Sequence, residues 1–147
     1  MALTQAARVQ TLHLLLRDGI DFGEASVSVH LGDNIKQCRP KFNVQLVRFH
    51  AYSQDARLCV VTTQTKYIEY TDKLRKDFGN DYGKLLISCI RPHKFVSKDT
   101  VAQWLKVMLG ICGIDTTKFT VGSGRPASTS KAKALAVPIS TIMAKAG

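Results

Sequence analysis

The stretch Ser26-Val27-Ser28-Val29-His30-Leu31 decides the fold class, because apolar and polar side chains alternate strictly along it. Its two valines and Leu31 would share one face, and its serines and His30 the other, which is typical of a half-buried strand. Residues 43–50 alternate in the same way, and turn-rich residues lie between the two stretches. We therefore expect a small antiparallel hairpin or three-strand sheet. Its turn region carries the cations Lys36, Arg39 and Lys41.

In most of the remaining chain, apolar residues recur at the spacing of a helix. Helices are expected over residues 3–16, where Asp18-Gly19 ends the pattern, and over 60–75, 97–113, 127–135 and 138–146. The third is the clearest, because Ser97 offers an N-cap and apolar side chains then recur every three or four positions until Gly113. Two of these, Trp104 and Met108, are expected to be core residues rather than a ligand-binding stripe. Residues 84–90 predict one further short strand.

The expected fold class is therefore α+β, mostly helical, with a small antiparallel sheet packed near the N-terminal side of a helical core. A chain of 147 residues has room for one domain, and 45% hydrophobic with 22% charged residues is typical of a globular protein. No apolar run approaches the ~20 residues of a membrane span or resembles the apolar region of a signal peptide. We expect an intracellular protein without a membrane partner, nuclear if the source is eukaryotic.

The cysteines give no sign of a metal site, because no CxxC motif or Cys/His ligand pair appears among Cys38, Cys59, Cys89 and Cys112. The last three lie in apolar runs, so we expect them to be reduced thiols in the core. The usual catalytic motifs GxxxxGK[ST], GxSxG and HExxH are also missing.

Positive charge is the unusual property of the chain. Twenty-one Lys and Arg against eleven Asp and Glu leave a net charge of +10, which makes a polyanion the first partner to consider. No carboxylate follows Asp115, and the Gly/Ser-rich residues 122–131 form either a flexible basic linker or the start of a helix. In the second case Arg125 and the helix amides could hold one phosphate. Arg8 lies among small and apolar residues, so it needs either a partner from elsewhere in the fold or an anion. The alternative for both Arg8 and Arg125 is that each is an ordinary surface arginine.

Read in order, several segments resemble the catalytic domain of the tyrosine recombinases, the phage-integrase-like enzymes that break and rejoin DNA, in their eukaryotic transposon-borne form. The segments are 2–12, 34–39, 57–61 with 67–71, 91–94 with 101–109, and 122–132. The first resembles the surroundings of the family's first catalytic arginine, the second its hairpin lysine, and the last its His-x-x-Arg box. The resemblance covers nearly the whole chain.

The resemblance implies phosphoryl transfer without a metal or other cofactor. In this family a tyrosine attacks a DNA phosphate while two arginines and a histidine stabilise the charge on the non-bridging oxygens. Arg8 and Arg125 would be those arginines, and Lys36 would be the general acid that protonates the leaving 5′-oxygen, with Lys41 as the alternative. Further DNA contacts are expected from Arg39, Lys41, Ser123, Ser128 and Lys131. The implied partner is double-stranded DNA, with self-association on it.

Four departures from the family pattern bear on activity. Gly122 stands where the family has its histidine, and Gln5-Ala6 stand where it usually has Thr-Gly. The chain ends at Gly147, about where the family continues to its nucleophilic tyrosine, and the DNA-clamping domain that precedes the catalytic one is not represented. None of the four tyrosines takes the place of the nucleophile: Tyr52, Tyr67, Tyr70 and Tyr82. Of these, Tyr67 and Tyr70 are expected at core or half-buried helix positions.

We therefore expect a recombinase-like domain over residues 1–147 that is incomplete at its C-terminus and inactive alone. Two other classes stay open. One is a small basic nucleic-acid-binding protein of the ribosome-associated type, without catalysis, and the other is a protein-interaction domain with incidental charge. The recombinase hypothesis alone requires Arg8, Lys36 and Arg125 to converge within about 5–8 Å. Of the three hypotheses, only the protein-interaction domain with incidental charge predicts that the chain does not bind DNA in a salt-dependent way.

Overall fold

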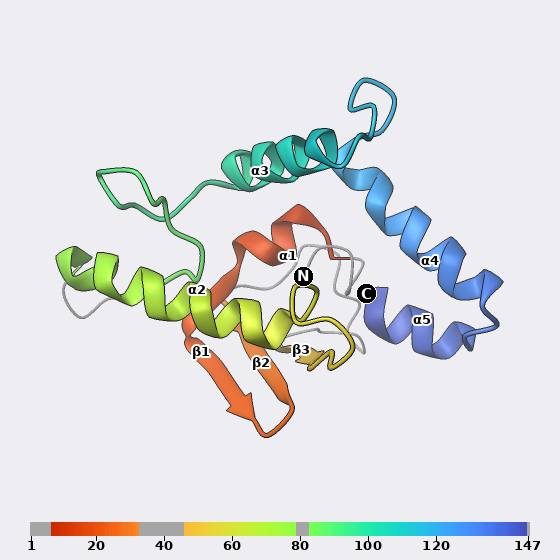
Figure 1. Cartoon of the computed structure of the whole chain (residues 1–147), viewed down its shortest axis with the longest axis horizontal. Coiled ribbons are helices and arrows are strands. Elements are labelled where there is room, and N and C mark those ends of the chain that lie inside the picture. The colour runs from red at the N-terminus through yellow and green to blue at the C-terminus, as the bar shows by residue number, and fades with distance from the viewer. Residues whose placement is uncertain (1–6, 33–45, 79–82, 147) are drawn as a thin grey trace.

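The computed structural model describes residues 7–32, 46–78 and 83–146, and within them the fold is α+β and mostly helical, as expected. The elements in chain order are α1 (Val9–His13), β1 (Leu15–Gly23), β2 (Ser26–Leu31), β3 (Leu46–His50), α2 (Val60–Leu74), the 3-10 turn η1 (Arg75–Phe78), α3 (Lys98–Ile111), the 3-10 turn η2 (Val121–Ser123), α4 (Gly124–Ala134) and α5 (Ile139–Ala146). Figure 1 shows α1 between α3 and the sheet, with α4 and α5 at the far end of α3.

The sheet has three antiparallel strands in the order β1-β2-β3, which confirms the prediction from the alternating stretch. The central strand β2 has the predicted bounds, and Val27 and Val29 on its inner face are completely buried. They pair with Phe49 and Val47 of β3, whose side chains are buried as well. These four residues, with Leu15, form the part of the core that anchors the sheet.

The first predicted helix is wrong over half of its described length. The structure has only the five-residue α1, and the chain enters β1 at Leu15, so Asp18 and Gly19 lie inside a strand rather than at a helix end. The reason is pairing with a distant segment, since Leu15 lies opposite Leu31 and a β-bulge separates this pair from Ile20. A Cβ at Gly19 would come within 2.6 Å of the His30 Cβ, so this close approach of two strands requires glycine.

The segment predicted as a strand at 84–90 is only partly strand-like. It makes isolated bridges, Leu16 with Lys84 and Ile87 with Phe95, rather than a continuous ladder. Leu85 and Ile87 are nevertheless completely buried, and the Leu85 N–H donates to the Leu15 carbonyl at 2.7 Å. The apolar pattern of this segment therefore reflects burial against β1 rather than a regular strand.

Helices α2 and α3 confirm their predicted positions. In α3 the Ser97 hydroxyl accepts a hydrogen bond from the Thr100 N–H at 3.1 Å, and Gly113 adopts a φ of 77° just beyond the helix, as caps require. The prediction that Trp104 and Met108 are core residues is wrong, because they are 40% and 54% exposed. Among the described elements α3 packs mainly on α1, and a helix of five residues is too short to cover one of fourteen.

The cysteines divide into two groups. Cys59, at the N-terminus of α2, is buried as predicted, whereas Cys89 and Cys112 are exposed, so the prediction of core thiols is wrong for these two. A hydrogen bond from Thr62, followed by one from the Tyr52 N–H at 3.4 Å, lowers the pKa of the Cys59 thiol to about 7. Cys89 lies near the exposed bend at residues 88–92, and Cys112 caps the uncovered end of α3.

Residues 121–134 are helical, so the flexible-linker interpretation of this Gly/Ser-rich stretch is wrong. α4 begins at Gly124, three positions before the predicted start, and α5 follows Pro138 as predicted. No helix among the described residues has both the length and the apolar composition needed to cross a membrane.

Candidate phosphate-binding site

Arg8 and Arg125 lie far apart in the sequence, and the charge of Arg8 acts on Arg125. Arg8 is the residue that precedes α1, and Arg125 is the second residue of α4. Arg125 is half-buried, and its pKa is lowered first by that burial and second by the positive charge of Arg8. The charge of Arg8 therefore acts at the position of Arg125, and a shared phosphate site needs two guanidinium groups that are neighbours in this sense.

The 3-10 turn η2, which leads directly into α4, begins with a capping box. The Thr120 N–H donates to the Ser123 hydroxyl at 3.1 Å, and the Thr120 side chain accepts from the Ser123 N–H. No acidic residue lies in the first turn of α4, so the positive end of the helix dipole is not neutralised by its own side chains. This rigid entry sets the position of Arg125.

The other residues expected to contact DNA lie in different settings. Ser123 belongs to the capping box, and the Ser128 hydroxyl donates to the Gly124 carbonyl at 2.9 Å, so both hydroxyls take part in the helix itself. Lys131 is exposed in the last turn of α4. The three hairpin cations, Lys36, Arg39 and Lys41, fall outside the described residues, and their roles stay predictions.

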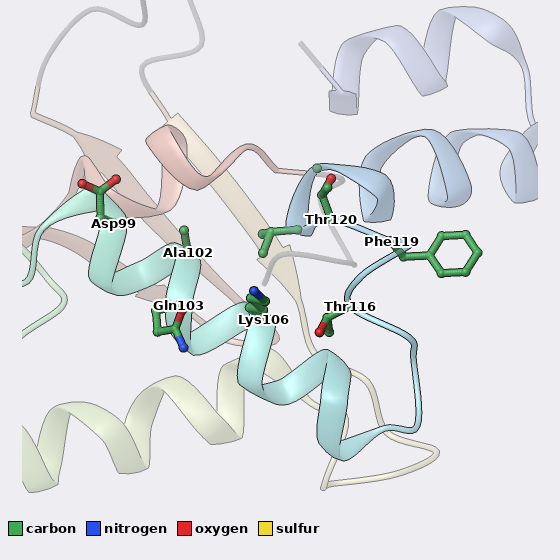
Figure 2. Close-up of a pocket in the computed structure, with 9 residues that line it drawn as sticks. Asp99, Ala102, Gln103, Lys106, Thr116, Phe119 and Thr120 are labelled. Atoms are coloured by element: carbon green, nitrogen blue, oxygen red, sulfur yellow. The ribbon is translucent and has the colours of Figure 1, made fainter.

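Gly122 lies beside a groove between α3 and residues 116–122, with a volume of about 340 Å³ (Figure 2). Asp99 and Lys106 of α3 lie along it, while the Phe119 ring points away from it. A Cβ at Gly122 would meet only the Thr120 hydroxyl, at an ordinary contact distance of 3.5 Å, and the backbone φ is not positive there. A side chain therefore fits at this position, and the local structure does not require glycine.

Among the described residues the buried arginine is Arg75, whereas Arg8 is exposed. Arg75 donates to the Lys84 carbonyl at 3.1 Å and to the Leu85 carbonyl at 2.5 Å, and burial lowers its pKa. Asp72 accepts two hydrogen bonds from Arg17, at 3.0 and 2.7 Å, and lies 3.9 Å from the Arg75 Nε. This network joins α2 to β1 and the segment around residue 85, so it is structural.

The sequence analysis missed that network, although one signal for it was present. Asp72 and Arg75 are separated by three positions at the end of α2, which is the spacing of neighbouring side chains on a helix. Of the tyrosines, Tyr67 is half-buried as predicted; it accepts a hydrogen bond from the Ile87 N–H at 3.0 Å, and burial raises its pKa. The corresponding prediction for Tyr70 is wrong, because that residue is 57% exposed.

Comparison with known proteins gave no match among protein-family models, curated proteins or solved structures. The paired arginines and the charge distribution therefore carry the functional argument.

Proposed function

We propose that this chain is a DNA-binding domain of the tyrosine-recombinase type, which binds a phosphate of double-stranded DNA with Arg8 and Arg125. The observation that carries the proposal is that the positive charge of Arg8, which precedes α1, acts on the half-buried Arg125 at the start of α4. Holding like charges together opposes folding, and an anion between them would convert the repulsion into attraction. A guanidinium is also the side chain whose fork of donors best matches phosphate oxygens.

The charge of the whole chain supports the same partner. A net charge of +10 attracts a polyanion, and the carboxylate-free sequence beyond Asp115 includes α4 and α5. In the proposed complex the Arg8 and Arg125 side chains contact the non-bridging oxygens of one phosphodiester, while Lys36 stays the candidate donor to the 5′-oxygen. Such a domain acts where DNA is found, which is the nucleus in a eukaryote.

The proposed domain binds DNA without cleaving it. Gly122 has no side chain to donate a hydrogen bond or a proton to the phosphate, and the Tyr67 hydroxyl is engaged by the Ile87 N–H. Charge stabilisation by two arginines lowers the barrier of phosphoryl transfer only when a nucleophile is also in place. We therefore expect this chain to supply part of a recombinase site rather than a complete one.

Binding is tested by fluorescence anisotropy with a labelled DNA duplex at 50 and 200 mM salt. Contacts from two cations alone give a log-log slope of affinity against salt of about −1.8, and further phosphate contacts make it steeper. Affinity that does not change with salt would favour the interaction domain with incidental charge. Tighter binding to a matched RNA duplex than to DNA would favour the ribosome-associated class.

Cleavage is tested with a suicide DNA substrate, which traps a phosphotyrosyl intermediate by losing the leaving strand. We expect no covalent protein–DNA adduct on a denaturing gel. An adduct would show that one of the four tyrosines acts as the nucleophile, and the conclusion that the chain is inactive alone would then be wrong.

A further inference from the structure

A second group of cations lies at the opposite end of α1 from Arg8. The Lys84 Nζ lies 2.7 Å from the Nε2 of His13, which is the last residue of α1. Lys98, the first residue of α3, also acts on His13 through its positive charge. Two segments that are far apart in the sequence thus place Lys84 in contact with His13, and Lys98 from a third segment acts on the same ring through its charge.

The contact between Lys84 and His13 fixes the protonation of the ring. A lysine ammonium can only donate, so the His13 Nε2 accepts and the ring is neutral, with its proton on Nδ1. Burial and then the charge of Lys84 lower the pKa of His13, with Lys98 adding to the effect and the Val96 backbone opposing it. The charged side chains that act on this ring are therefore both positive.

No carboxylate balances this cluster among the residues that the structure describes. Neither Lys84 nor Lys98 lies within 4.0 Å of a carboxylate oxygen there. Asp99 follows Lys98 in the chain, but it lines the groove on α3 and is not among the charges that act on His13. The site therefore has the composition of an anion-binding site, with two ammonium groups around a neutral imidazole.

The position of the cluster relates it to the arginine pair. Arg8 precedes α1 and His13 ends it, and five residues of helix rise about 7.5 Å. Successive phosphates on one strand of B-DNA rise about 3.4 Å along the axis, so two steps span about 7 Å. α3 packs on α1 (Figure 1), and the charge of Lys98 at the start of α3 acts on His13 at the end of α1.

We propose that His13, Lys84 and Lys98 bind a second phosphate of the same DNA strand, one or two nucleotides from the phosphate bound by Arg8 and Arg125. This inference rests on the proposed function, since it assumes a DNA backbone along α1. The bound phosphate takes the hydrogen bonds of the Lys84 ammonium, which then no longer donates to His13. Its negative charge also raises the pKa of His13, so that binding is accompanied by proton uptake.

The first test compares the salt dependence of DNA binding for Lys84→Gln and Lys98→Gln with that of Lys66→Gln, an exposed α2 lysine, as the matched control. Loss of one phosphate contact reduces the magnitude of the log-log slope of affinity against salt by about 0.9. Raising the salt from 50 to 200 mM therefore weakens DNA binding by a factor that is about 3.5-fold smaller for the variant than for the wild type. We expect this for Lys84 and Lys98 and no change for Lys66. Lys84→Arg should restore the wild-type slope, because it restores the charge.

The outcomes separate the two proposals. If Arg125→Gln reduces the slope but Lys84→Gln and Lys98→Gln do not, the second phosphate site is wrong and the first stands. If none of the three variants reduces the slope, the proposed function itself is wrong. Lys98 is exposed, so Lys98→Gln is expected to fold. It keeps the test decisive even if Lys84→Gln fails to fold.

The second test follows the His13 ring by NMR while pH is varied, with and without a short DNA duplex. We expect the pKa of His13 to be higher in the complex and DNA affinity to increase as pH falls through that pKa. The histidine that titrates in this way is assigned with His13→Gln. An unchanged pKa of His13 in the complex would overturn the proposal.

Discussion

The most informative substitution is Arg125→Gln, which removes one guanidinium from the proposed phosphate site while keeping a polar side chain. A hydrogen bond to a charged group contributes about 1.5–3 kcal/mol, so affinity for duplex DNA should fall about 10- to 150-fold. The log-log slope against salt should also fall by about 0.9. Stability should change by no more than about 0.5 kcal/mol, because burial and Arg8 both disfavour the charge in the folded state.

Anisotropy titrations over several salt concentrations measure both quantities, and thermal unfolding followed by circular dichroism checks the fold. The matched control is Arg57→Gln, which makes the same change in net charge at a side chain that is 90% exposed and paired with Asp55 at 2.8 Å. Its effect on affinity should be small. An equal loss for both variants would mean that binding responds to net charge alone, and unfolding of Arg125→Gln would mean that its role is structural.

Three further predictions concern other positions. Arg75→Met should lower stability by about 2–6 kcal/mol, since it leaves two backbone carbonyls without their buried donor, whereas Asp72 keeps its two hydrogen bonds from Arg17; a chemical-denaturation midpoint close to that of the wild type would contradict the network. Gly122→His should fold and should gain more DNA affinity between pH 8 and pH 6 than the wild-type chain does, and an equal gain would place Gly122 away from the phosphate. Iodoacetamide should label exposed Cys89 and Cys112 before buried Cys59, and mass spectrometry that found the reverse order would contradict the packing.

Local patterns predicted the elements that depend on local interactions. The alternation at 26–31 gave the bounds of β2, and the cap at Ser97 gave the start of α3. The failure at residues 3–16 arose from distant pairing, because Leu15 pairs with Leu31 and helical spacing cannot reveal a partner strand. Trp104 is exposed for a related reason, since the pattern of α3 predicts an apolar face but not the length of the helix that covers it.

The candidate site was predictable only in part. Arg8 and Arg125 stood out because few carboxylates surround them in the sequence, and the structure adds that their charges interact. The contact of His13 with Lys84 spans 71 positions, so it depends on the packing of α1 against the segment after α2, which no local pattern contains. The alternation at 43–50 extends into residues that the structure does not describe, and the hairpin lysine Lys36 stays a prediction.

The central claim is that Arg8 and Arg125 bind the same phosphate, and a double-mutant cycle on DNA affinity tests it most directly. Arg8→Gln, Arg125→Gln and the double variant are titrated with one duplex at one salt concentration. If one phosphate contacts both arginines, the double variant loses less binding free energy than the sum of the two single losses, by about 0.5–3 kcal/mol. Losses that add to within about 0.3 kcal/mol would contradict it, because independent sites behave in that way.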